Sequence, residues 1–256
     1  MDRDDTAKVL GLPRDKVRII PSAAGGGFGA KLDVSVQPLL GLAVLKTGKP
    51  CRMVFTRSDS MRASTKRHPG TMQATIGADA EGRVTAMKFH GDFNTGAYAS
   101  WGPTVATRVP VHASGPYLTP HYRATSRAVH SNGPSSGAFR GFGVPQAAMT
   151  QEILYDELAE KCGLDRLAFR HLNALRDGDK TPFGQTLKAV GQVECLEALK
   201  PHWQRLLSET AAFNAKSGAL KRGIGIASCW YGCGNTSLPN PSTVRIGITA
   251  NGRGML

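Results

Sequence analysis

The stretch Gly137-Ala138-Phe139-Arg140-Gly141-Phe142-Gly143-Val144-Pro145-Gln146 decides where the strongest predicted helix begins. Proline suits the first turn of a helix, and the apolar spacing continues over 145–162, with Ile153, Leu154 and Leu158 on one face. Ahead of that helix, glycines leave the backbone bare beside an arginine and two aromatic rings. Unpaired N–H groups and the dipole at a helix N-terminus favour negative charge. The stretch therefore suits an anionic cofactor or a planar substrate, and equally an ordinary core turn before a helix.

A second glycine-rich stretch, Gly25-Gly26-Gly27-Phe28-Gly29-Ala30-Lys31, lies about 110 residues upstream. It follows a predicted strand over 17–20 and precedes a predicted helix over 36–47. Consecutive glycines let several backbone N–H groups converge without side-chain obstruction, which makes a concave site for an anion or an oxo group. The spacing is neither that of a dinucleotide fingerprint nor that of a phosphate loop. A tight turn between strand and helix is the competing interpretation.

Helical and strand patterns are both present along the chain, so we expect an α+β fold of mixed sheets with packed helices. A hairpin is predicted over 71–89, with its turn at Asp79-Ala80-Glu81-Gly82, and glycine and proline predict irregular, exposed structure over 95–114. The remaining predicted strands cover 52–55, 122–130, 223–230 and 243–250, and the remaining helices 6–10, 165–174 and 191–215. Asn251-Gly252 predicts a hairpin for which only four residues remain, so we expect a C-terminal portion to be absent or supplied by another chain.

Composition excludes several classes of protein. The chain has 256 residues, of which 41% are hydrophobic and 20% charged, as is typical of a globular protein. No apolar run reaches the roughly 18 residues that span a bilayer, and the start is acidic, so we expect a cytoplasmic protein without a membrane partner. The formal charge of +13 is spread along the chain without a nucleic-acid-binding motif, so no nucleic-acid partner is expected. The five cysteines suit reduced thiols, and Cys229 and Cys233 lack further metal ligands nearby.

Together, and in this order, the two glycine-rich stretches resemble those of the molybdenum hydroxylases, the family of aldehyde oxidoreductase and xanthine dehydrogenase large subunits. The resemblance continues through shorter segments: Lys66-Arg67-His68-Pro69, Asn94-Thr95-Gly96-Ala97-Tyr98, Gly115-Pro116-Tyr117, Ala159-Glu160-Lys161-Cys162-Gly163, Asn173-Ala174 and Gly178-Asp179. It implies a first molybdenum-cofactor-binding domain over 1–188, lacking its extreme N-terminal part, and the incomplete start of a second such domain over 189–256.

The resemblance also implies which residues hold the cofactor, a molybdopterin with or without a cytosine dinucleotide. The implied cofactor-binding positions are Gly26, Gly27, Phe28, Gly29, Arg140 and Gly141. Phe28 and Arg140 are expected to present backbone atoms near the molybdenum ligands. Three further positions are implied to bind the substrate: Leu32, Arg108 and Phe142.

The substrate positions differ in what they imply. Phe142 resembles the aromatic residue that stacks on a heteroaromatic substrate. Arg108 resembles an arginine that stabilises charge developing on a purine, and an ordinary surface arginine is the alternative. Leu32 stands where xanthine-oxidising members carry a glutamate. Because leucine cannot accept a hydrogen bond from the substrate ring, an aldehyde or a less polar N-heteroaromatic substrate is favoured over xanthine.

The implied enzyme hydroxylates a carbon atom of an aldehyde or an N-heteroaromatic, purine-like substrate with oxygen from water, and it passes electrons to 2Fe-2S and FAD partners. Its general-base glutamate lies downstream of the residues present here, so no catalytic residue is assigned and the isolated chain is expected to be inactive. The complementary C-terminal molybdopterin-binding half is therefore an expected partner. A cofactor-binding module without catalysis of its own and a nonfunctional truncated product are the alternatives.

Overall fold

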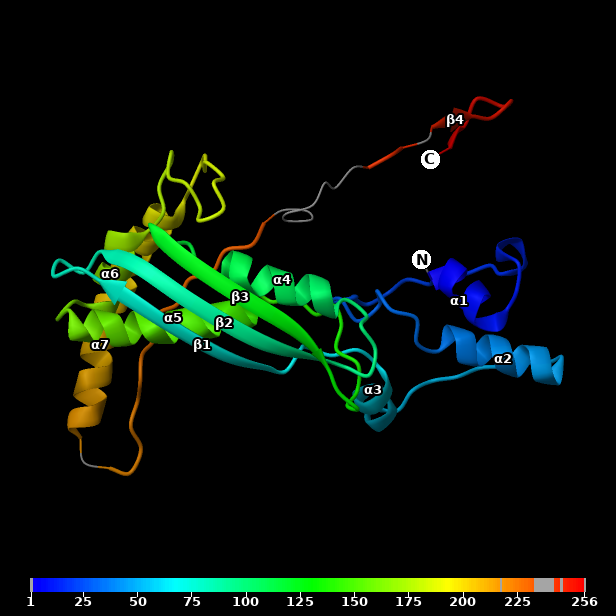
Figure 1. The fold of residues 1–256 in the computed structure, drawn as a ribbon, viewed down its shortest axis with the longest axis horizontal. Helices are drawn as coiled ribbons and strands as arrows, with labels where there is room; N and C mark the ends of the chain where they lie inside the picture. The colour runs from blue at the N-terminus through cyan, green and yellow to red at the C-terminus, as the bar shows by residue number, and fades with distance from the viewer. Residues whose placement is uncertain (1, 217, 233–241, 245, 256) are drawn as a thin grey trace.

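The computed structural model describes residues 2–216, 218–232, 242–244 and 246–255 of the chain (Figure 1). Its helices are α1 (Asp2–Leu10), the 3₁₀-helix η1 (Arg14–Lys16), α2 (Gln37–Thr47), α3 (Arg57–Ala63), α4 (Gly102–His112), α5 (Val144–Lys161), α6 (Arg166–Asn173) and α7 (Gln192–Ala215). Its strands are β1 (Gly70–Ala78), β2 (Val84–Gly96), β3 (His121–His130), β4 (Gly247–Ile248) and β5 (Gly254–Met255). The predicted α+β class is confirmed. Among the described residues, every helix is too short or too polar to span a lipid bilayer.

A three-stranded mixed sheet, in the order β1-β2-β3, organises the fold. β1 and β2 are the predicted hairpin, paired antiparallel with Gly70 opposite Phe93. β3 pairs parallel to β2, with His121 opposite Ala86. A parallel pair cannot be joined by a tight turn, and α4 lies in the crossover connection between β2 and β3.

The main apolar core lies between one face of this sheet and helices α4 and α5 (Figure 1). Residues of β2 that share a face point toward the helices, because successive side chains of a strand face opposite sides. The core comprises Met87, Phe89 and Phe93 of β2, Ala106, Val109 and Ala113 of α4, and Ala147 of α5. Burial of one phenylalanine side chain contributes roughly 1.5–3 kcal/mol, so this layer holds α4 and α5, and the loops beside them, in fixed positions.

A buried ionic network joins α5 to α6. Nη2 of the fully buried Arg170 lies 2.6 Å from Glu152 Oε2 and 2.8 Å from Asp156 Oδ1. The Tyr117 hydroxyl donates to Glu152 Oε1 at 2.8 Å, and burial together with this carboxylate raises the pKa of the phenol far above its usual value. Asp165 caps α6 as predicted, because its side chain accepts two backbone N–H bonds of the first turn.

The prediction of irregular, exposed structure over 95–114 is wrong for its second half. Gly102–His112 form α4, in which Val105 and Val109 are buried. One proline stands in the first turn, where its missing N–H costs nothing, and Pro110 lies near the end of the helix. Burial of an apolar face with helical spacing therefore outweighs the low helix propensity of proline.

α5 confirms the predicted helix, but part of its predicted apolar face is wrong. Ile153 is 55% exposed, whereas Gln151, Tyr155 and Ala159 are fully buried. The reason is the ionic network, since α6 packs on the side of α5 that carries Glu152. Polar residues consequently occupy the inner face, which a hydrophobic pattern cannot reveal.

Three predicted strands are not strands in the structure. The segments 17–20, 52–55 and 223–230 form no ladder with any described residue. At the other end of the chain, β4 and β5 pair around Asn251-Gly252 and confirm the predicted hairpin. The predicted strand 243–250 shortens to two residues there and lies partly outside the described residues. A strand needs a neighbour to pair with, and local composition does not supply one.

Candidate functional site

The two glycine-rich stretches, far apart in the sequence, meet in the structure. We call residues 25–31 the first loop and residues 137–146 the second loop. The Arg140 backbone N–H donates to the Phe28 carbonyl oxygen at 2.9 Å, and the Arg140 guanidinium lies 5.7 Å from the centre of the Phe28 ring. Gly29 marks the closest approach: its φ is +90°, and an added Cβ would lie 2.7 Å from a carbonyl oxygen of the second loop. Only glycine allows this approach, so the two loops form one site.

The first loop presents bare backbone on its open side. A Cβ added at Gly25 or Gly27 would meet nothing within 4 Å. In the part of the chain that the structure describes, the N–H groups of 25–28 donate no hydrogen bond. Phe28 has a φ of +52° and is 60% exposed. Positive φ is uncommon in an aromatic residue and is often found at ligand sites. Backbone donors that are unpaired within the described residues therefore lie in an exposed stretch next to an exposed ring.

These features fit an anionic pterin cofactor. Consecutive unpaired amides make an anion-binding concavity, and two cations lie beside it. The Lys31 ammonium donates to the Gly26 carbonyl oxygen, and Arg140 is exposed next to Phe28. The second loop leads into the N-terminus of α5 through Gly143, which has a φ of +103°. The positive end of the helix dipole adds to the attraction for negative charge.

The two backbone groups predicted near molybdenum are not equivalent. The Arg140 N–H already donates to the Phe28 carbonyl oxygen. The Phe28 N–H makes no hydrogen bond within the described residues, so it is the available donor of the pair. Gly141, the neighbouring predicted position, has a φ of +86°, and a Cβ there would lie 2.6 Å from the Pro145 ring.

A segment that the sequence analysis gave no role, residues 66–68, holds the second loop. The Arg67 guanidinium donates to the Arg140 carbonyl oxygen at 2.6 Å and lies 4.7 Å from the centre of the Phe139 ring. Its other terminal nitrogen donates to Gln146 Oε1 at 3.3 Å. One side chain thereby spans the second loop up to the start of α5. No local signal reveals a contact between residues 73 positions apart.

His68 continues this segment inside the protein. Its ring is buried, and neither ring nitrogen has a hydrogen-bond partner among the described residues. Burial, followed by the charge of Arg67, lowers the pKa of His68 to about 4, so the imidazole is neutral at pH 7. The His68 carbonyl oxygen accepts from Gln146 Nε2 at 3.2 Å, which ties the backbone of the segment to α5.

Two of the three predicted substrate positions lie together. Arg108 is only 5% exposed, so its interpretation as an ordinary surface arginine is wrong. Its guanidinium lies 5.1 Å from the centre of the Phe142 ring, and Nη1 donates to the Tyr231 hydroxyl at 3.1 Å. Trp101 meets the Phe142 ring edge-on, with 6.2 Å between ring centres. The arrangement places a buried cation against the face of an aromatic side chain.

Leu32, the third predicted substrate position, lies just past the first loop. Its N–H donates to a carbonyl oxygen of that loop at 3.2 Å, and its side chain is about two-fifths exposed. The next residue, Asp33, accepts a hydrogen bond from the Ser100 hydroxyl at 2.8 Å. This bond fixes the chain that leaves the first loop against the turn before α4.

A cavity of about 440 Å³ was not predicted; its lining includes Tyr231, whose hydroxyl accepts a hydrogen bond from Arg108. The His112 ring stacks on the Tyr231 ring with 5.7 Å between centres, and Trp230 Nε1 donates to the His112 carbonyl oxygen at 3.3 Å. Desolvation lowers the pKa of His112. The cavity is lined by α4, the turn at 181–187 and residues 230–232. These segments meet only in the tertiary structure, so no pattern in the sequence joins them.

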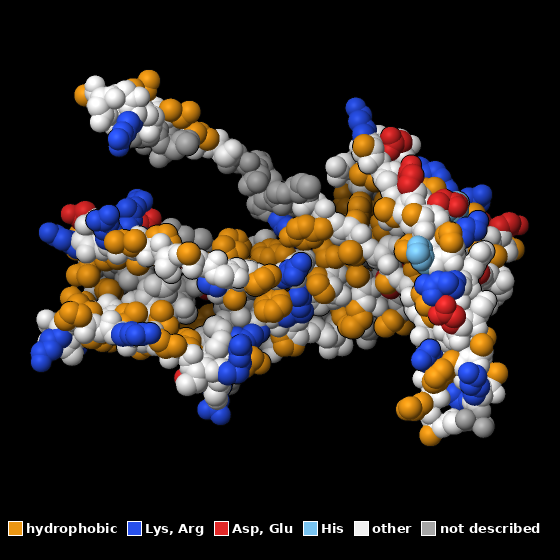
Figure 2. Space-filling model, turned by 180° about the vertical axis from the view of Figure 1, so that it is seen from behind, with side chains coloured by type: hydrophobic (Ala, Val, Ile, Leu, Met, Phe, Trp, Pro, Cys, Tyr) orange, Lys and Arg blue, Asp and Glu red, His pale blue; other side chains and the backbone are white. Residues whose placement is uncertain are grey.

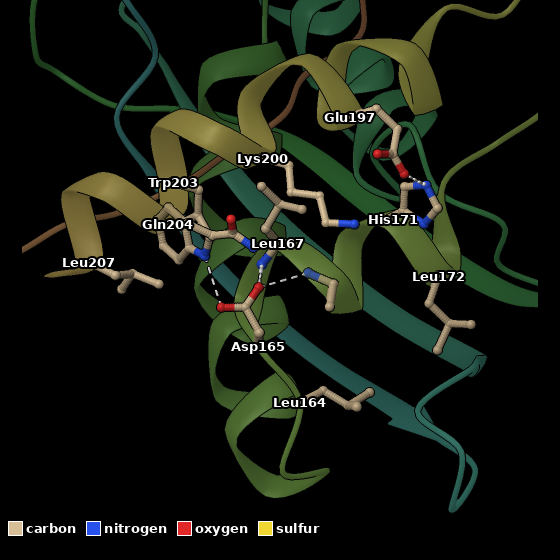
Figure 3. A pocket seen from close by; sticks show the side chains of 11 residues that line it. Leu164, Asp165, Leu167, His171, Leu172, Glu197, Lys200, Trp203, Gln204 and Leu207 are labelled. Atoms are coloured by element: carbon tan, nitrogen blue, oxygen red, sulfur yellow. Dashed lines mark hydrogen bonds and ion pairs between the residues drawn. The ribbon is translucent and has the colours of Figure 1, made fainter.

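Another cavity, of about 560 Å³, lies between α6 and α7 (Figure 3). Trp203 Nε1 donates to Asp165 at 2.8 Å on one side of it, and His171 pairs with Glu197 at 2.7 Å on another. No residue of the two loops lines this cavity, so its size does not make it the candidate site.

A metal ion held by side chains alone has no site in the described ranges. No group of three or more His, Cys, Asp or Glu side chains there is arranged to bind one. Cys229 is exposed, and Cys233 lies outside the described residues.

Comparison with known proteins identifies the family to which most of the chain belongs. Residues 1–174 match the family profile described as molybdopterin cofactor-binding domain. The chain is 48% identical over 197 residues to the nicotinate dehydrogenase large molybdopterin subunit of Eubacterium barkeri, an alignment that covers 77% of this chain and 46% of that subunit. It is 32% identical over 230 residues to the xanthine dehydrogenase molybdenum-binding subunit of Escherichia coli O157:H7, covering 88% of this chain and 30% of that protein.

A solved structure shares the fold. The aldehyde oxidoreductase from Desulfovibrio gigas superposes with a TM-score of 0.79 and 29% sequence identity, over 85% of this chain and 24% of that one. The chain thus spans less than half the length of each of these three proteins.

Proposed function

This chain belongs to the molybdopterin cofactor-binding domain family of molybdenum hydroxylase large subunits, and we propose that it holds cofactor and substrate in an enzyme that hydroxylates an N-heteroaromatic ring. One observation carries the proposal. The second loop bonds to the first loop through Arg140 and stacks on Arg108 through Phe142, only two residues further on. Two residues span at most about 7 Å, so the contact to the first loop and the contact to Arg108 lie next to each other on the second loop.

We assign the cofactor to the open side of the first loop. The amides of Gly26 and Gly27 would bind its anionic groups, and the Phe28 N–H would donate near the molybdenum ligands. Gly29, Arg140 and Gly141 would keep the two loops together around it. When bound, the molybdenum pterin supplies a two-electron oxidation that inserts an oxygen from water into a C–H bond. A cytosine dinucleotide would add phosphates of the kind that these amides and Lys31 bind.

We assign the substrate to the Phe142 face. The ring would stack on a planar substrate, and the Arg108 guanidinium would stabilise negative charge that develops on it. Leu32 offers no hydrogen-bond acceptor, which argues against xanthine. The relative from Eubacterium barkeri, named for nicotinate, supports a pyridine-like ring over the aldehyde that the resemblance equally allows.

Further parts of the enzyme are assigned to partners. We propose that the general base and the complementary C-terminal molybdopterin-binding half come from outside residues 1–256, and that 2Fe-2S and FAD partners accept the electrons. The isolated chain would then bind the cofactor and the substrate but would not oxidise the substrate. We also propose that the first domain ends near residue 188 and that 189–256 begin the second.

The test compares substrates in the assembled enzyme, by substrate-dependent dye reduction and by molybdenum analysis. Nicotinate should be oxidised with a higher kcat/KM than benzaldehyde or xanthine. Arg108→Gln should lower kcat/KM for nicotinate about 100-fold, since loss of a buried charged partner costs roughly 2–3 kcal/mol. It should change the value for benzaldehyde far less. Arg123→Gln, at an exposed position of β3, is the matched control. An equal loss with both substrates, or an assembled enzyme without molybdenum, would contradict the proposal.

A further inference from the structure

Arg108 and His112 lie one turn apart on α4, and both are buried. Side chains four positions apart point to the same face of a helix. His112 Nδ1 lies 2.9 Å from the Arg108 carbonyl oxygen, and because a carbonyl oxygen can only accept, Nδ1 carries a proton. Burial, and then the charge of Arg108, lowers the pKa of His112. The imidazole is therefore a neutral ring at pH 7, packed beside a cation.

Two aromatic residues that follow α7 in the sequence pack on this face of α4. The Tyr231 ring stacks on the His112 ring with 17° between the planes, and the Trp230 ring meets His112 edge-on at 6.0 Å. Trp230 Nε1 also donates to the His112 carbonyl oxygen, at the helix end where carbonyl groups lack a partner within the helix. Ser228 Oγ accepts from Gln192 Nε2 at 2.9 Å, which ties the same segment to the start of α7. Several contacts therefore hold Tyr231 in place.

The Tyr231 hydroxyl meets the guanidinium of Arg108. It accepts a hydrogen bond from Arg108 Nη1 at 3.1 Å, while the guanidinium also lies against the Phe142 ring. Arginine has a long side chain with many rotamers, so contact with a ring alone does not fix the direction of its N–H groups. A phenol is neutral near pH 7 and therefore holds the guanidinium without cancelling its charge, as a carboxylate would.

The surface over this part of the molecule is poor in acidic side chains. In Figure 2 these gather mainly at the end that carries α6 and α7. Apolar and basic side chains cover the middle of the same face, where α4 and α5 lie (Figures 1 and 2). Few negative charges on this face therefore offset a cation on α4.

We propose that Tyr231 is a positioning residue for the hydroxylation, because its hydroxyl holds the Arg108 guanidinium beside the Phe142 ring, where the substrate would lie. The inference rests on the proposed function and adds a basis for substrate preference. A cation fixed in advance favours a ring on which negative charge develops, such as that of a heteroaromatic acid, over a neutral aldehyde. Because this charge develops during the reaction, the benefit falls on kcat more than on KM.

The test is a double-substitution cycle in the assembled enzyme, with nicotinate and benzaldehyde as substrates. Tyr231→Phe keeps the ring and removes the hydrogen-bond acceptor. It should lower kcat for nicotinate about 10-fold, change KM less than about 2-fold and leave benzaldehyde oxidation nearly unchanged. In an enzyme that already carries Arg108→Gln, Tyr231→Phe should lower kcat less than about 2-fold, because it acts only through the guanidinium.

Tyr122→Phe is the matched control. The Tyr122 hydroxyl donates to the Pro110 carbonyl oxygen, so this substitution removes a tyrosine bond to the same helix and leaves the contact with Arg108 intact. It should lower stability in urea without changing the ratio of nicotinate to benzaldehyde oxidation. An equal change of this ratio in Tyr122→Phe and Tyr231→Phe would assign the effect to the packing of α4 and overturn the proposal.

The outcomes separate this inference from the proposed function. Selective loss of nicotinate oxidation in Arg108→Gln but not in Tyr231→Phe would overturn the inference and leave the function standing. Equal loss of both substrates in Arg108→Gln would contradict the function, and the inference with it. Urea unfolding of the free chain tests the contact itself: if the effects of Arg108→Gln and Tyr231→Phe on stability are additive, the two side chains do not interact and the inference is overturned.

Discussion

Adding one methyl group at Gly29 or at Gly27 should have opposite consequences for folding and for cofactor binding. At Gly29 the Cβ would lie 2.7 Å from the Ala138 carbonyl oxygen and 2.9 Å from the Phe139 Cα, both of which are backbone atoms that cannot swing away. The φ of +90° costs an L-residue about 1–2 kcal/mol, and relief of the overlap costs about 1–3 kcal/mol more. Gly29→Ala should therefore lower the free energy of unfolding by about 2–5 kcal/mol and break the bond from Arg140 to Phe28.

At Gly27 the same methyl group meets nothing within 4 Å. Gly27→Ala should change the free energy of unfolding by less than about 1 kcal/mol, because the site is open and the unfolded chain loses some freedom. The methyl group would, however, project onto the face assigned to the cofactor. We expect the assembled enzyme to lose most of its molybdenum, although the free chain remains as stable as the wild type.

Urea unfolding of each free chain and metal analysis of each assembled enzyme check both expectations. A Gly29→Ala chain that unfolds at the wild-type urea concentration would refute the close contact between the loops. A Gly27→Ala enzyme that retains its full molybdenum content would refute the assignment of the cofactor face. The two results are independent, so a wrong cofactor assignment cannot be mistaken for a folding defect.

Three further substitutions test the parts that support the site. Arg170→Ala leaves the Glu152 carboxylate buried without its cation and should lower the free energy of unfolding by about 3–5 kcal/mol in urea titrations. His68 stays neutral in the folded protein down to about pH 4, whereas in the unfolded chain it binds a proton below about pH 6.5. The free energy of unfolding should therefore fall by on the order of 3 kcal/mol as the pH drops from about 6.5 to about 4. His68→Leu should flatten this pH dependence, and an unchanged dependence would exclude this histidine as its source. Arg67→Lys cannot reach several acceptors at once and should lower molybdenum retention about 10-fold, an effect that exposed Arg62→Lys should not reproduce.

Local signals in the sequence determined most elements of this fold. Gly48 ends α2 with a φ of +62°, and Asp165 caps α6 through its side chain. The turn at 79–82 joins β1 to β2 in the predicted hairpin. In each case the deciding interaction joins residues only a few positions apart, so the local sequence is enough to predict it. The bare glycines of the two loops were recognisable for the same reason.

Only the tertiary structure decided how these pieces combine. Three features depend on contacts between segments more than 70 residues apart. They are the bond from the Arg140 N–H to the Phe28 carbonyl oxygen, the position of Arg67 across the second loop, and the burial of Arg108. The strands expected at 17–20 and 52–55 find no neighbour among the described residues for the same reason, since pairing is a property of two segments and not of one. Such contacts are selected by the packing free energy of the whole chain, which no window of local sequence contains.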